Sequence, residues 1–169
     1  MQKDKNKETK GKDMDIKIEK MTKEHLEQIK DILKEQFDKF WNANVLDKEL
    51  ENPLSTYIVA VSEDKVVGYA GLWQPLDEGH ITNIVTRKDK RGNKIATNML
   101  EELIEIAKSK NLKCVTLEVN IHNNIAIKLY QKYDFKEVGR RPRYYNNIDD
   151  AIIMTLELTC LGTGQKRVN

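Results

Sequence analysis

Apolar residues near the start of the chain change from a two-residue to a helical spacing, which indicates a strand followed by a helix. Ile16 and Ile18 alternate with charged residues, as in a strand with one buried face. Thr22 then offers a helix N-cap, and apolar side chains recur behind it at intervals of three and four residues. This predicted helical stripe consists of Leu26, Ile29, Leu33, Phe37 and Phe40.

Three consecutive strand-like runs follow a second, shorter helical segment, which is broken at Asn52-Pro53. The runs cover residues 57–61, 66–73 and 80–86. Turn-forming residues separate them, at positions 64–65 and again at 77–79. The middle of the chain therefore predicts hairpins between neighbouring strands.

The second half of the chain alternates between helix and strand. One long helix is marked by Ile95, Met99, Leu103 and Ile106. A strand at 115–119 separates it from a second helix, which is marked by Ala126, Leu129, Tyr130 and Tyr133. With two final strands at 135–138 and 151–158, the predicted fold class is α/β, a mixed central sheet of about seven strands flanked by about four helices. No Gly-x-Gly-x-x-Gly follows the first strand, so a doubly wound dinucleotide fold is not expected.

Composition limits the location and the class of partner. The 169 residues fit one domain, which we expect at 14–158 between a disordered charged tail at 1–13 and a C-terminal tail at 159–169. With 29 basic and 27 acidic residues, the net charge of +2 does not indicate direct nucleic-acid binding. The two cysteines lack disulfide or metal-site spacing, and no run suits a signal peptide or membrane span. We therefore expect a cytoplasmic protein with neither metal nor membrane partner.

The segment from Ile84 to Thr97 joins a strand to the start of the long helix. A tight turn there directs backbone N–H groups outward at the positive end of the helix, which suits an anion such as a pyrophosphate. The small residues Gly92 and Ala96 would let such a ligand approach the backbone. The same sequence also fits an ordinary basic surface loop, so by itself it leaves both interpretations open.

Two polar residues downstream are candidates for proton transfer. Glu118 lies inside the apolar run 114–119, where a carboxylate is costly unless it meets water or a partner such as a lysine. Asn123 is a candidate N-cap of the next helix, and Tyr130 follows it two turns later on the same side. Taken singly, Glu118 could equally be a solvated carboxylate at the end of a strand, and Tyr130 could equally be an aromatic side chain packed in the core.

The loop before the long helix resembles motif A of the Gcn5-related N-acetyltransferases (GNAT family), here Arg91-Gly92-Asn93-Lys94-Ile95-Ala96. This resemblance implies the GNAT fold, acetyl-CoA as cosubstrate and no metal. It also implies that the strand end and loop bind acetyl-CoA through Ile84, Val85, Thr86, Gly92, Asn93, Lys94, Ile95, Ala96 and Thr97. Lys94 departs from the family pattern, because it occupies the position of the first motif glycine. Its side chain would crowd the diphosphate, strain the backbone unless φ stays negative, or add a charge contact to phosphate.

Residues 117–135 resemble the bacterial ribosomal-protein-alanine N-acetyltransferases, with Asp134 in place of a usual glycine. Residues 140–145 are similar to the Arg-x-Tyr-Tyr loop of that subgroup, and residues 149–154 to its Asp-Ala-Ile-Ile-Met strand. The resemblance covers about Ile16 to Leu158, and its C-terminal half is the specific part.

The subgroup resemblance assigns a role to each candidate. Glu118 would be the general base and Tyr130 the general acid, while Asn123 would contact the cofactor. Tyr144 and Tyr145 would form a wall of the peptide groove, although surface aromatics on a hairpin fit the sequence equally well. The implied reaction moves acetyl from acetyl-CoA to the N-terminal α-amine, of alanine type, of a ribosomal protein. A peptide α-amine has a reference pKa near 8, so a carboxylate can accept its proton at neutral pH.

Two other functions remain open at this stage. The same fold would also serve a small-molecule amine acetyltransferase, because fold does not fix the acceptor. Lys94 in the phosphate loop motivates a non-enzymatic acyl-CoA-binding module. Of the three histidines, we expect His25 to face solvent and His80 to open a strand without an evident partner, while His122 lies beside the candidate site as an alternative base.

Overall fold

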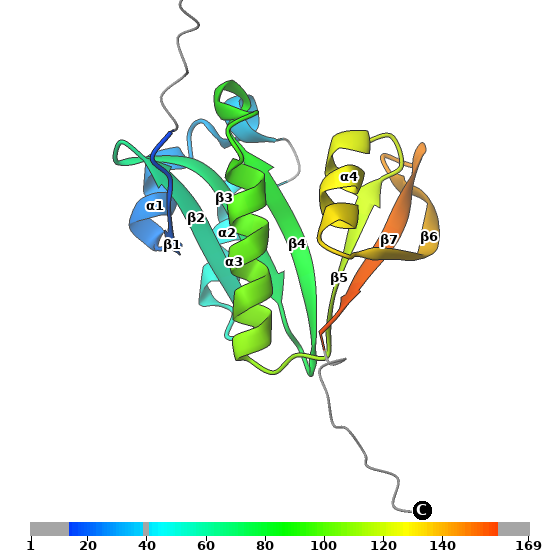
Figure 1. The fold of residues 1–169 in the computed structure, drawn as a ribbon. Helices are drawn as coiled ribbons and strands as arrows, with labels where there is room; N and C mark the ends of the chain where they lie inside the picture. Colours follow the sequence, from blue (N-terminus) through cyan, green and yellow to red (C-terminus); the bar gives the residue numbers. More distant parts are fainter. Residues whose placement is uncertain (1–13, 39–40, 159–169) are drawn as a thin grey trace, which may run out of the picture.

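A mixed seven-stranded sheet forms the centre of the protein, in the order β1-β2-β3-β4-β5-β7-β6 (Figure 1). Its strands are β1 (Lys17–Lys20), β2 (Ser55–Ser62), β3 (Lys65–Trp73), β4 (Glu78–Thr86), β5 (Cys114–Asn120), β6 (Lys136–Tyr145) and β7 (Asp149–Glu157). All neighbouring strands are antiparallel except β4 and β5, which run parallel. The computed structural model describes residues 14–38 and 41–158, so both predicted tails and Phe40 lie outside the described residues.

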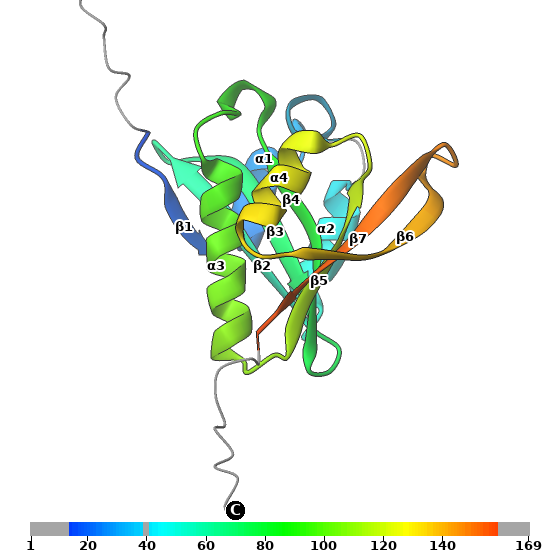
Figure 2. The same ribbon diagram turned by 45° about the vertical axis from the view of Figure 1, so that its right-hand side comes forward.

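Helices cover both faces of the sheet, as predicted. The α-helices are α1 (Lys23–Ile29), α2 (Ala43–Glu51), α3 (Ile95–Ser109) and α4 (Asn124–Lys132). Two shorter segments are the π-helical η1 (Leu33–Phe37) and the 3₁₀ turn η2 (Lys88–Lys90). Figures 1 and 2 show α3 on one face of β1–β4, and α1 and α2 on the other. Within the described residues, no helix is long and apolar enough to cross a membrane.

The side chains of the first helical stripe are buried along its described length, but the α-helical backbone hydrogen bonds beneath them are interrupted. Leu26, Ile29, Leu33 and Phe37 are all buried in one core, as the spacing predicted. However, the Ile32 N–H donates to the Ile29 carbonyl at 3.0 Å, a tight turn that ends the α-helical ladder before η1 begins. Apolar spacing reports which side chains are buried, and it does not fix the hydrogen-bond register of the backbone.

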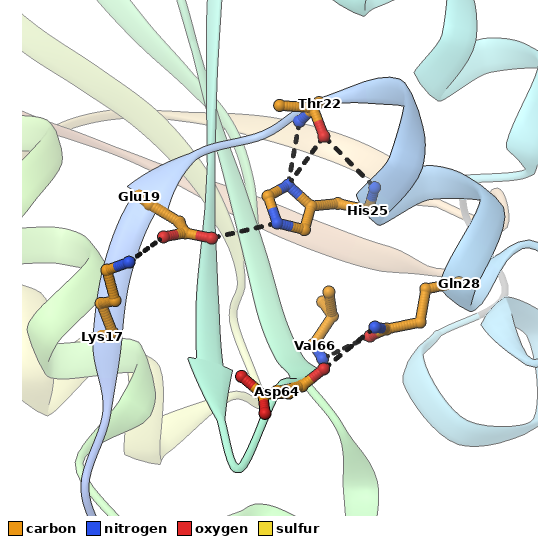
Figure 3. A network of polar contacts seen from close by, with 7 residues as sticks. All are labelled: Lys17, Glu19, Thr22, His25, Gln28, Asp64 and Val66. Atoms are coloured by element: carbon orange, nitrogen blue, oxygen red, sulfur yellow. Dashed lines mark hydrogen bonds and ion pairs between the residues drawn. The ribbon is translucent and has the colours of Figure 1, made fainter.

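His25 does not face solvent, and this prediction was wrong. Its Nδ1 accepts from the Thr22 backbone N–H at 3.0 Å, while the Thr22 hydroxyl accepts from the His25 N–H at 3.4 Å. Its Nε2 lies 3.1 Å from a Glu19 oxygen (Figure 3). His25 thus takes the place of the usual Glu or Gln in a capping box at the start of α1, and it joins that helix to β1.

Replacing His25 by Ala should lower the free energy of unfolding by about 1 kcal/mol, because the box loses one of its two reciprocal bonds. His25→Gln should lose less, since a Gln at this position can also accept from the N-cap N–H. Urea unfolding of both variants measures the difference. His122→Ala is the matched control, because the His122 side chain is 75% exposed. Equal losses in the three variants would contradict a capping role for His25.

A β-bulge in β4 lets that strand serve both cores of the protein. The β3 partners of Ile81 and Asn83 are adjacent residues, so Thr82 is an extra residue in β4. Ile81 packs in the core under α3, whereas Val85 packs in the core under α1 and α2. Residues four apart in an undisturbed strand share one face, and the extra residue reverses this. The bulge thereby turns polar side chains of β4 toward the site described next.

Candidate active site

A cleft opens where the parallel strands β4 and β5 part. They are paired only from Glu78–His80 to Cys114–Thr116, and Figure 1 shows them diverging beyond that point. The cleft has a volume of about 620 Å³. It is lined by Asp38, Trp41, residues 80–85, residues 117–120, Asn123, Tyr130, Tyr144 and Tyr145.

The structure brings half of the predicted site residues into this one cleft. The catalytic candidates Glu118 and Tyr130 both line it. So do the predicted cofactor contacts Ile84, Val85 and Asn123, and the predicted peptide contacts Tyr144 and Tyr145. The remaining predicted cofactor contacts lie outside the lining, at the end of β4 and around the start of α3: Thr86, Gly92, Asn93, Lys94, Ile95, Ala96 and Thr97.

Glu118 has partners on two other strands of the sheet. Its side chain is 10% exposed, and its Oε2 lies 2.8 Å from His80 Nε2 on β4. Its Oε1 accepts from Arg141 Nε on β6 at 3.1 Å. These partners correct two expectations, since His80 is not without a partner and the carboxylate pairs with an arginine and a histidine instead of a lysine. Neither partner was predicted from the sequence. Arg141 lies within residues 140–145, which resemble the Arg-x-Tyr-Tyr loop, but no pattern there pairs it with Glu118.

The closure of α4 holds the ring of Tyr130 in place. The N–H of Phe135 donates to the Tyr130 carbonyl at 3.1 Å, and the N–H of Asp134 donates to the Gln131 carbonyl at 3.1 Å. This is a Schellman closure, with Asp134 in the left-handed conformation at φ +65°. The rings of Tyr130 and Phe135 pack with centroids 5.8 Å apart. Burial raises the pKa of Tyr130 to about 12, with a smaller contribution from Tyr145.

Asn123 is the N-cap of α4, as predicted. Its side-chain oxygen accepts from the Ala126 N–H at 3.2 Å. That bond fixes the side chain at the rim of the cleft, and its amide N–H groups make no hydrogen bond with any described residue. Asn123 can therefore cap the helix and still donate to a bound ligand.

Tyr144 and Tyr145 belong to strand β6, whereas the sequence suggested a loop. Their rings meet edge to face, with centroids 5.1 Å apart and planes at 86°. The Tyr145 hydroxyl donates to the Glu118 backbone carbonyl at 3.3 Å, and burial, Tyr144 and Glu118 together raise the pKa of Tyr145 to about 12. Tyr144 remains 54% exposed at the cleft mouth. Tyr145 is thus fixed against β5, while the exposed ring of Tyr144 is available to contact a ligand that enters the cleft.

A polar cluster on the opposite wall was missed from sequence. The Tyr57 hydroxyl lies 2.9 Å from Thr82 Oγ1, and burial raises the pKa of Tyr57 to about 12. A Cβ at Gly71 would lie 2.3 Å from the Tyr57 ring, so only glycine lets this ring cross β3. Asn83 lies near the same hydroxyl, yet its buried amide lacks hydrogen-bond geometry to any described group.

The loop before α3 exposes backbone N–H groups at a helix start. Lys94 adopts the left-handed conformation, with φ +59° and ψ +17°, so φ is not negative and the backbone strain considered from the sequence is present. Gly92 also has a positive φ, of +82°. The Lys94 carbonyl accepts from the Asn98 N–H at 3.0 Å, so the first turn of α3 is formed, and no acidic residue lies in that turn. The geometry suits an anion.

Replacing Lys94 by Gly should raise the free energy of unfolding by about 1 kcal/mol, because a left-handed residue with a Cβ is strained. Asp134→Gly, the matched control at the end of α4, should gain less, since Asp tolerates this conformation better. Urea unfolding measures whether Lys94→Gly gains more free energy of unfolding than Asp134→Gly does. Destabilisation by Lys94→Gly would contradict the strain argument. Weaker acetyl-CoA binding by Lys94→Gly alone would show that the ammonium also contacts phosphate.

Comparison with known proteins identifies the family. A profile described as the acetyltransferase (GNAT) family matches residues 26–135, and the chain therefore belongs to this family. The chain is 31% identical over 139 residues, 81% of its length, to a Bacillus subtilis protein provisionally assigned as a ribosomal protein bS18-alanine N-acetyltransferase, and the match covers 92% of that protein. The protein is thus an acetyl-CoA-dependent N-acetyltransferase, and the non-enzymatic reading is not favoured.

Solved structures share the fold. The ribosomal-protein-S18-alanine N-acetyltransferase from Escherichia coli superposes with a TM-score of 0.79 at 24% identity, over 89% of this chain and 98% of that one. Arabidopsis thaliana NAA60 in complex with acetyl-CoA superposes with a TM-score of 0.76 at 17% identity, over 85% of this chain and 99% of that one. The predicted mixed sheet with flanking helices is thereby confirmed as the fold of this family.

Proposed function

We propose that the protein acetylates the N-terminal α-amine, of alanine type, of a ribosomal protein. The observation that carries this proposal is the placement of Glu118 and Tyr130 in one cleft, between the Tyr144-Tyr145 wall and the uncovered part of β4. The relatives named for ribosomal-protein alanine acetylation support the choice of acceptor. A cleft open between strands, with aromatic side chains at its mouth, suits an extended peptide end.

Acetyl-CoA would bind along the uncovered edge of β4 and the start of α3. Beyond His80, no described strand pairs with that edge, so backbone groups around Ile84 and Val85 are available to the acyl and pantetheine part. The N–H groups in the first turn of α3 would hold the diphosphate. Asn123 would donate its amide from the other side of the cleft. No group of three or more metal-ligating side chains occurs in residues 14–38 and 41–158.

The proposed chemistry needs three proton transfers. Glu118, directly or through a water, accepts a proton from the α-ammonium, and the freed nitrogen forms a bond to the thioester carbon. As the C–S bond breaks, the phenol of Tyr130 gives its proton to the sulfur. The nitrogen loses a second proton when the amide forms, and this proton restores the phenol. Each ammonium acetylated therefore releases one net proton.

A panel of acceptors tests this proposal. Peptides beginning with Ala, Ser, Thr or Met would compete with polyamines and internal-lysine peptides, while free thiol release reports turnover with acetyl-CoA. Preferential turnover of an Ala-type N-terminus is the expected result. Faster turnover of a small amine would overturn the acceptor, and no turnover on any amine would overturn the activity itself.

A further inference from the structure

His80 is the one histidine among the described residues that contacts the proposed base. Its Nε2 lies 2.8 Å from Glu118 Oε2, while the other carboxylate oxygen is held by Arg141. We propose that His80 is a positioning residue that receives the proton from Glu118 and passes it to solvent. This inference rests on the proposed function, because it takes Glu118 as the base.

The proton balance of the reaction requires such an outlet. One net proton leaves for each ammonium that is acetylated, and Glu118 must be deprotonated again before the next turnover. The Glu118 side chain is only 10% exposed, whereas His80 is 29% exposed. Oε1 faces the Arg141 guanidinium, which cannot accept a proton. The proton on Glu118 would therefore leave from Oε2 and reach solvent through the imidazole of His80.

The transfer is balanced at named atoms. Protonated Oε2 of Glu118 donates to Nε2 of a neutral His80 that carries its hydrogen on Nδ1. Glu118 returns to the carboxylate, and His80 Nδ1 gives its proton to water. Proton exchange with water then moves the remaining ring hydrogen from Nε2 back to Nδ1 before the next turnover, with no further net proton released. Among the described residues, no hydrogen bond to Nδ1 competes with this step. Imidazole suits the role, because one ring nitrogen can accept a proton while the other donates one.

The surroundings of His80 define which other groups could change the same titration. Glu118 on β5 and Arg141 on β6 are the charged groups in its network. The remaining titratable side chains of the shared cleft are Asp38, Tyr130, Tyr144 and Tyr145. The tyrosines whose pKa values are raised to about 12, Tyr130 and Tyr145, stay neutral over the range in which an imidazole titrates. The acidic limb of the activity profile should therefore depend on the His80–Glu118 pair, with Asp38 as the other carboxylate to control.

Kinetics separates proton transfer from a merely structural contact. His80→Gln keeps a donor toward Glu118 but cannot take up the proton, so kcat should fall by about 10-fold or more with KM for both substrates nearly unchanged. The kcat of His80→Ala should fall by a similar factor. Added imidazole should restore it, because imidazole fits the space left by the ring. His25→Gln is the matched control, because His25 caps α1 and does not line the cleft, and it should keep the wild-type pH profile. Wild-type kcat and pH profile in His80→Gln, or no imidazole rescue of His80→Ala, would overturn the proposal.

A measurement without turnover distinguishes this proposal from the proposed function. NMR titration of the His80 imidazole in the wild type and in Glu118→Gln should give different midpoints, because the two groups share a proton. Asp38→Asn should leave the midpoint nearly unchanged. Identical midpoints in the wild type and Glu118→Gln would rule out the coupling. If the wild type acetylated no amine but the midpoints differed, the proposed function would fail while the proton contact stood.

Discussion

Glu118→Gln should lower kcat for peptide acetylation by about 10²- to 10⁴-fold, the usual contribution of a general base. Gln has nearly the same shape, so it can still accept from Arg141 Nε, 3.1 Å away in the wild type. What it cannot do is take a proton from the ammonium. We therefore expect acetyl-CoA affinity and the fold to be kept. Steady-state kinetics, acetyl-CoA titration and urea unfolding of the same preparation measure the three quantities.

The loss should be largest at neutral pH and smaller at high pH. Above the α-amine pKa near 8, the acceptor is already deprotonated in solution and the base has less to do. Glu157→Gln is the matched control, because it makes the same change on an exposed residue of β7, the strand paired with β5. A uniform loss at every pH, or equal losses in both variants, would mean that Glu118 acts through structure and not as a base.

The sequence predicted the seven strands and the long helices because their signals are local. Alternation at Ile16 and Ile18, turns between hairpin strands and the apolar stripe from Ile95 to Ile106 each depend on neighbouring residues only. Motif spacing also placed Asn123 correctly as the cap of α4. Helix ends were less certain, since Leu33–Phe37 continue the stripe with a different hydrogen-bond pattern.

Contacts across the cleft were not predictable in the same way. His80 meets Glu118 only because β4 and β5 are paired in one register up to His80 and then diverge. The two residues are far apart in sequence, and no periodicity encodes that register. The bulge at Thr82 is a second case. It places Ile81 and Ile84, three residues apart, against the same core, and this break in the alternation does not by itself identify a bulge. Long-range pairing therefore determines which polar residues join the predicted pair of Glu118 and Tyr130.

Tyr130→Phe should lower kcat by about 10²-fold while acetyl-CoA affinity stays nearly unchanged, because the substitution removes only the proton donor. The ring itself remains packed on Phe135, whose centroid lies 5.8 Å away. Single-turnover kinetics would place the loss in the chemical step and not in product release. Tyr133→Phe is the matched control at the C-cap of the same helix, since its hydroxyl bonds to Glu101 at the surface. Full activity in Tyr130→Phe would remove the assigned acid.

The direction of the pKa shift gives Tyr130 a second, independent test. Because burial raises its pKa to about 12, the phenol remains a proton donor where a free tyrosine, with a pKa near 10, would be half ionised. The wild-type kcat should therefore stay level up to about pH 10. Stability, unlike kcat, should fall with pH in this range. The unfolded chain loses this proton at a lower pH than the folded protein does, so the free energy of unfolding decreases from about pH 10 toward pH 12. Tyr130→Phe should lessen that fall, and an unchanged slope would show that the phenol is not buried as a neutral donor.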